Sequence, residues 1–66
     1  MVVVLNGKQV EEEDGLSLHD MLLKRGIEPE RVVVELNYEI VERIKWKDTP
    51  VKNGDRLEVL KFVGGG

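Results

Sequence analysis

Sixty-six residues with a formal net charge of −3 indicate one small acidic domain, because a compact core takes most of such a chain. The absence of cysteine and the single histidine exclude side-chain sulfur chemistry and a disulfide framework, and disfavour an all-protein zinc site. There is no apolar run of roughly 20 residues, no basic signal-peptide region and no basic patch. We therefore expect a monomeric cytoplasmic protein without metal, membrane or nucleic-acid partners.

The first predicted element is a hairpin. Val2–Leu5 forms a short apolar run, and Asn6-Gly7 behind it is typical of a type I′ turn, in which both central residues take positive φ. The run Lys8–Glu12 is expected to return beside the first strand. The acidic residues Glu11–Asp14 favour a solvated strand end, with a docking patch for a basic partner as the alternative.

Helix signals coincide in the next segment. Ser17 is a predicted N-cap, Asp20 stands at the third helical position as in a capping box, and Gly26 is a natural stop. The residues between them form an apolar stripe at helical spacing, which predicts about two turns packed on the strands. That stripe consists of Leu18, Met21 and Leu22.

Two more strands are predicted after the helix. Val32–Leu36 is rich in β-branched residues, and Asn37 opens a turn into a short strand near Glu39–Val41. The following segment, Glu42–Val51, is expected to be mostly irregular. Its Trp46 is interpreted as a packing anchor rather than a ligand contact, since a small core-poor domain needs a large apolar side chain.

The turn Asn53-Gly54-Asp55 introduces the last predicted strand, Arg56–Phe62. The order β-β-α-β-β-β leaves few compact arrangements, because the helix has to cover one sheet face by a right-handed crossover. We expect the first and third strands to be parallel, with the last strand between them. This is an α+β, ubiquitin-like β-grasp: a mixed sheet of four to five strands with one main helix on one face, built from residues 1–62.

The face of the sheet away from the helix carries a predicted partner-binding patch. Glu35 and Glu58 mark the exposed side of their strands, so alternation assigns Val33, Leu60 and Phe62 to the same side. In the first strand Val3 and Leu5 are expected to face the core, which leaves Val4 outside. Contiguous exposed apolar surface indicates a partner, and scattered surface valines are the alternative. The patch comprises Val4, Val33, Leu60 and Phe62.

Residues 63–66 are predicted to form a flexible reactive tail. Gly64 and Gly65 lack side chains and would pass through a channel too narrow for other residues, carrying the α-carboxylate of Gly66 into another enzyme's active site. That carboxylate is ionised at pH 7 and would attack the α-phosphate of ATP, giving an acyl-adenylate that a sulfur nucleophile converts to a thiocarboxylate. The alternative is an inert, frayed tail.

Three segments carry a family resemblance: LNGK at Leu5–Lys8, ELNYEIVER at Glu35–Arg43 with Trp46 beyond it, and NGDRLEVLKFVGGG at Asn53–Gly66. Together they resemble the ThiS-like sulfur carrier proteins of thiamin biosynthesis, within the ThiS/MoaD ubiquitin-like family. The resemblance implies a carrier rather than an enzyme, with Gly66 as the adenylation and thiocarboxylate site and no bound cofactor. It also implies three partners: a ubiquitin-activating-like adenylyltransferase that uses ATP, a cysteine desulfurase relay as sulfur donor, and thiazole synthase as acceptor.

Three other functions stay open on the sequence. The architecture also resembles the small subunit of molybdopterin synthase, which is usually longer around the helix. A ubiquitin-like modifier would join Gly66 to target lysines. A passive binding module would use only the patch on the open sheet face, with an inert tail.

Overall fold

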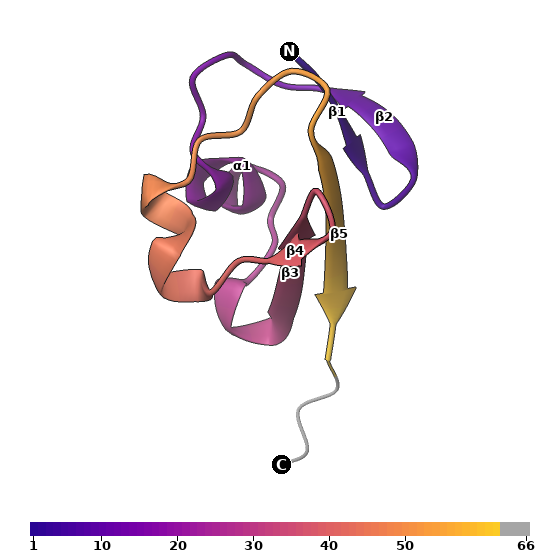
Figure 1. Cartoon of the computed structure of the whole chain (residues 1–66). Coiled ribbons are helices and arrows are strands. Elements are labelled where there is room, and N and C mark those ends of the chain that lie inside the picture. The colour runs from indigo at the N-terminus through magenta and orange to yellow at the C-terminus, as the bar shows by residue number, and fades with distance from the viewer. Residues whose placement is uncertain (63–66) are drawn as a thin grey trace.

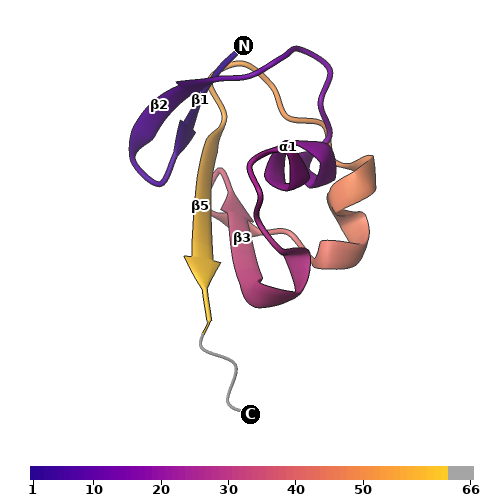
Figure 2. The ribbon, with the colours of Figure 1, turned by 180° about the vertical axis from the view of Figure 1, so that it is seen from behind.

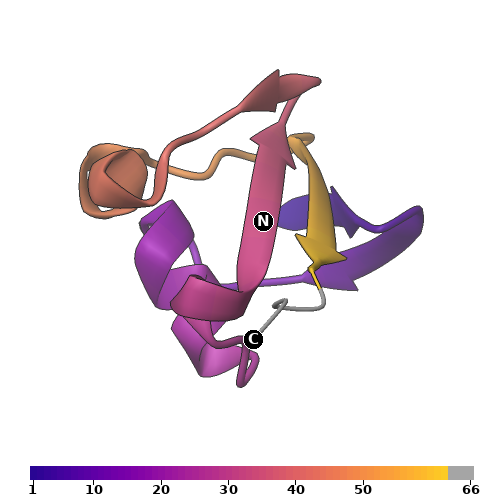
Figure 3. The same cartoon turned by 90° about the horizontal axis from the view of Figure 1, so that it is seen from below.

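The structure, a computed structural model, describes residues 1–62, so the predicted tail at 63–66 lies outside the described residues. A mixed five-stranded sheet in the order β2-β1-β5-β3-β4 carries the helices on one face (Figures 1 and 3). The strands are β1 (Val2–Leu5), β2 (Lys8–Glu11), β3 (Val32–Leu36), β4 (Glu39–Ile40) and β5 (Arg56–Lys61). The helices are α1 (Leu18–Lys24) and two 3₁₀ helices, η1 (Pro29–Arg31) and η2 (Arg43–Asp48).

The first hairpin forms as predicted. Asn6 and Gly7 take φ values of 49° and 81°, which is the left-handed pair that a type I′ turn requires. β1 has the predicted bounds, and β2 ends one residue earlier than expected, at Glu11. The tight turn sets the pairing in which Val3 lies opposite Val10.

Helix α1 begins and ends at the predicted residues. The Ser17 hydroxyl accepts a hydrogen bond from the Asp20 amide at 3.0 Å, which satisfies one of the free N–H groups of the first turn. At the other end Gly26 takes φ 74° and donates its N–H to the Leu23 carbonyl at 2.9 Å, as in a glycine-terminated helix.

Among the described residues, no helix combines the length and apolarity that crossing a membrane requires.

The predicted direction of the first and third strands is wrong. β1 is parallel to β5, with Val4 opposite Arg56, whereas β5 is antiparallel to β3, with Val34 opposite Val59. β1 and β3 are therefore antiparallel. The reason is that the helical crossover leaves from β2, which is itself antiparallel to β1, so β3 follows the direction of β2. The predicted place of β5 between β1 and β3 is confirmed (Figures 1 and 2).

Trp46 anchors the core, as predicted. Its side chain is fully buried, and the indole N–H donates to the Val41 carbonyl at 2.8 Å. The surrounding segment is not irregular as expected, because Arg43–Asp48 forms the 3₁₀ helix η2. Of its six residues only Trp46 is buried, so the sequence has no repeat of buried apolar residues that would predict this helix. The buried core is Val3, Leu18, Met21, Leu22, Val32, Val34, Trp46, Val51 and Leu57.

Candidate functional site

The open face of the sheet, opposite α1, brings together three of the four predicted patch residues. Val33 of β3 lies directly opposite Leu60 of β5, and Phe62 follows two residues beyond Leu60. Their side chains are 37%, 53% and 50% exposed. The Phe62 amide donates to the Arg31 carbonyl at 3.1 Å, which continues the pairing of the two strands to this point. We call Val33, Leu60 and Phe62 the apolar patch.

The fourth predicted residue lies apart from the apolar patch. Val4 is half-buried and pairs with Arg56, four residues before Leu60 in β5. The Arg56 guanidinium lies 4.5 Å from the centre of the Tyr38 ring and donates to Glu58 at 3.0 Å. Val4 therefore borders a cationic and aromatic group at the far end of the face.

Between these two regions lie Glu35 and Glu58, which were predicted to mark the exposed side, together with two exposed residues that were not predicted to lie on this face. Glu35 of β3 stands opposite Glu58 of β5, and on its other side it pairs with Ile40 of β4. Ile40 is 67% exposed, and Tyr38 in the preceding turn is 74% exposed. The turn at Asn37 could have predicted the places of Ile40 and Tyr38. A two-residue hairpin loop determines which residue of the short strand pairs with Glu35.

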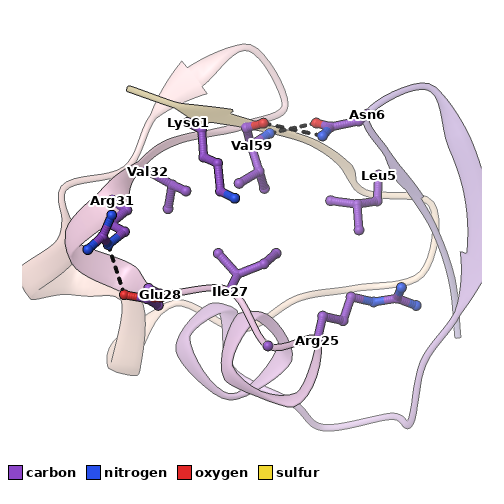
Figure 4. A pocket seen from close by; sticks show the side chains of 10 residues that line it. Leu5, Asn6, Arg25, Ile27, Glu28, Arg31, Val32, Val59 and Lys61 are labelled. Carbon is purple, nitrogen blue, oxygen red and sulfur yellow. Dashed lines mark hydrogen bonds and ion pairs between the residues drawn. The ribbon is translucent and has the colours of Figure 1, made fainter. Parts of the chain in front are cut away.

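An open groove of about 420 Å³ lies on the other side of the sheet, at the C-terminal end of α1 (Figure 4). None of the four predicted patch residues lines it. Ile27, Val32 and Val59 form its apolar walls, and the Lys61 side chain points into it (Figure 4). The sequence pattern does not predict this groove, because alternation along β5 would place an apolar residue at the position that Lys61 occupies.

Two of the three cations around the groove are already paired. Arg31 binds Glu28 at 2.9 Å, and Arg25 forms an ion pair with Glu12. The groove therefore presents mainly apolar walls and a single lysine that forms no ion pair within residues 1–62. Apolar walls and one lysine do not form a binding site for a highly charged anion.

The acidic run before α1 is exposed at Glu11, Glu13 and Asp14, as predicted for a solvated strand end, and Glu12 is the exception. The Glu12 side chain is only 4% exposed and contacts both Arg25 and, at 3.9 Å, Lys24. Glu13 binds Lys24 at 2.8 Å. These carboxylates meet the basic residues at the end of α1, where positive charge is also favoured by the helix dipole. Glu12 and Glu13 thus tie the β2–α1 loop to the helix.

A Lys24→Met variant is expected to raise the pKa of Glu13. The hydrogen bond from Lys24, and then its charge, hold the pKa of the Glu13 carboxyl below its usual range. The pair therefore stabilises the folded protein at neutral pH, and this contribution is lost as the pH falls through the lowered pKa. Carboxyl-carbon NMR titration of Glu13 measures the change, with Lys52→Met as the control. Identical Glu13 midpoints in wild type and Lys24→Met would contradict the assignment.

The sheet order and the single main helix crossing from β2 to β3 define a ubiquitin-like β-grasp domain. The family model described as "ThiS family" matches residues 3–66, and the chain belongs to this family. It is 35% identical over 63 residues to the sulfur carrier protein ThiS of Bacillus subtilis (strain 168), covering 94% of this chain and 96% of that protein. The crystal structure of a thiamine biosynthesis protein (ThiS) from Geobacter metallireducens superposes with a TM-score of 0.83 at 40% identity, over 100% of both chains. The predicted fold and family are confirmed.

Two larger relatives contain a matching segment. The chain is 33% identical to a thiazole synthase from Paramagnetospirillum magneticum and 36% identical to one from Magnetococcus marinus. Each match covers the whole of this chain but only 20% of the relative. The chain therefore spans about a fifth of the length of these thiazole synthases.

Proposed function

We propose that this protein is a sulfur carrier of thiamin biosynthesis, a cosubstrate rather than an enzyme. The observation that carries the proposal is the family match, which runs through the terminal glycines to residue 66. The Bacillus subtilis relative of nearly equal length is named a sulfur carrier protein, and the Geobacter metallireducens relative a thiamine biosynthesis protein. In this proposal, the folded domain of residues 1–62 is the part that other enzymes bind, and residues 63–66 are the part on which they act.

The reactive group in this proposal is the α-carboxylate of Gly66. A carboxylate with a pKa of about 3.3–3.7 is ionised at neutral pH and is a poor electrophile. Attack on the α-phosphate of ATP forms an acyl-adenylate and releases pyrophosphate. A persulfide of the sulfur donor then adds to the activated carbonyl and AMP leaves, and a thiol reduces the resulting acyl disulfide to the thiocarboxylate that donates sulfur for thiazole formation. Gly64 and Gly65 suit a narrow channel because neither has a Cβ atom.

The proposal includes three partners, which the family resemblance implies. An adenylyltransferase of the ubiquitin-activating type binds the ATP, so the carrier itself needs no cofactor, and a cysteine desulfurase relay supplies the sulfur. Thiazole synthase accepts it, which is supported by the two thiazole synthases that contain a segment matching this chain. The apolar patch is the proposed docking surface for these enzymes, since exposed contiguous apolar residues favour partner binding. All of these steps are proposed to occur in the cytoplasm, where ATP is available.

Intact-protein mass spectrometry tests the proposal. The purified chain is incubated with ATP, the adenylating enzyme of the same organism and a sulfur donor. The expected products are first the adenylate and then a species in which one oxygen is replaced by sulfur, localised to Gly66 by fragmentation. A variant lacking Gly64–Gly66 is the control and should gain neither mass.

The opposite result is equally clear. If the chain keeps its original mass while the same enzyme adenylates the Bacillus subtilis ThiS, the carrier function is overturned and a passive binding module is favoured. A mass increase equal to a second polypeptide joined through a lysine would instead favour a ubiquitin-like modifier.

A further inference from the structure

Two carboxylates of like charge stand opposite each other in the middle of the open sheet face. Glu35 of β3 and Glu58 of β5 are directly paired residues, and like charges in this position destabilise a sheet. Glu58 accepts a hydrogen bond from Arg56 at 3.0 Å. Within residues 1–62, no ion pair joins Glu35 to a cation. The folded domain thus holds a carboxylate pair that it only partly neutralises.

Exposed apolar side chains flank this carboxylate pair on both sides. Ile40 of β4 lies directly opposite Glu35. Along the strands in the other direction come Val33 and Leu60, which belong to the apolar patch. A partner that covers these apolar groups also removes water from the carboxylates between them. Burying a carboxylate is costly unless it gains a cationic hydrogen-bond donor, so the covering surface has to supply one.

We propose that the adenylating enzyme covers this face with an arginine set between apolar side chains, and that its guanidinium bridges Glu35 and Glu58. The inference rests on the proposed carrier function. Arginine suits the position because its planar group presents five N–H donors and can reach two neighbouring carboxylates, whereas lysine offers a single point charge. The pair is then a recognition element, whose repulsion in the free protein is relieved in the complex.

The short tail explains why this enzyme has to meet the open face. Residues 63–66 can span at most about 14 Å even when fully extended. An enzyme that takes Gly66 into its active site therefore lies close to Phe62, the last residue of the apolar patch. The patch continues along β3 and β5 into the carboxylate pair, so a surface of ordinary interface size that begins at Phe62 extends over Glu35 and Glu58.

Glu35→Gln and Glu58→Gln test the inference, with Glu39→Gln as a matched control. Glu39 pairs with Leu36 and so lies on the other side of the same hairpin, and its change removes the same charge. With the adenylating enzyme of the same organism and ATP, pyrophosphate release is measured against carrier concentration. The two test variants should raise KM for the carrier at least about tenfold with kcat unchanged, while Glu39→Gln leaves both constants unchanged.

Stability supplies a second readout. Loss of the like-charge contact should leave the urea midpoint of Glu35→Gln equal to or above that of wild type, so weaker recognition would accompany an equally or more stable fold. Unchanged KM in both test variants, or an equal rise in Glu39→Gln, overturns the inference while adenylation still supports the carrier function. If the wild-type chain itself is never adenylated, the carrier function fails instead.

Discussion

A Gly65→Trp variant is expected to fold like the wild-type protein and to be adenylated at least about 100-fold more slowly, because a misplaced reacting group loses this much of its rate. The indole would block a channel shaped for residues without side chains and hold the Gly66 carboxylate away from the α-phosphate of ATP. Folding should be unaffected, since every member of the buried core lies between Val3 and Leu57. Single-turnover formation of the adenylate, followed by mass spectrometry, measures the effect.

Lys8→Trp is the control for this experiment. Lys8 is exposed on the edge strand β2, separated from β5 by β1, so the same ring is introduced away from the apolar patch. This variant should be adenylated at the wild-type rate. Normal adenylation of Gly65→Trp would show that the terminal glycines are not selected for passage through a narrow channel.

Trp46→Ala is expected to lower the free energy of unfolding by about 3–5 kcal/mol, the usual cost of truncating a large buried aromatic side chain. The indole is 1% exposed and its N–H is bonded to the Val41 carbonyl. A domain of this size has a total stability of about 3–10 kcal/mol. The variant should therefore lose a large part of its stability, which appears as a markedly lower midpoint in a urea titration followed by circular dichroism.

Ile44→Ala is the matched control, because Ile44 belongs to the same 3₁₀ helix η2 but its side chain is 83% exposed. Its stability should stay within about 0.5 kcal/mol of wild type. Equal urea midpoints for Trp46→Ala and Ile44→Ala would contradict the role of Trp46 as the anchor that attaches η2 to the core.

Local signals predicted the ends of the elements well. Asn6-Gly7, Ser17 and Gly26 act within a single turn of the chain, so their residue types alone indicate the structure around them. The predicted relative direction of β1 and β3 was wrong, because this direction depends on which strand the helical crossover leaves. The helix η2 was missed because its only buried residue is Trp46, which leaves no period to detect.

The candidate site was predictable only in part, for a similar reason. Alternation along a strand assigns a residue to a face but not to a position along that face. The pairing of Val4 with Arg56 separates it from the apolar patch, and the pairing of Glu35 with Glu58 creates the carboxylate pair. Both depend on contacts between strands far apart in sequence. The role of Gly66 stays a prediction, since that residue lies outside the described part of the chain.

The central place of β5 also bears on how the protein is made. Its parallel partner is β1, so the pair Leu5 and Leu57 closes a loop of about fifty residues, and such long-range pairing slows folding. During synthesis on the ribosome, the hairpins β1–β2 and β3–β4 emerge first and remain unjoined until β5 has been translated. A truncated product that stops before β5 would leave both hairpins with open edges, exposed to proteases and to aggregation. Chains that stop before β5 are therefore not expected to accumulate as folded competitors of the complete protein.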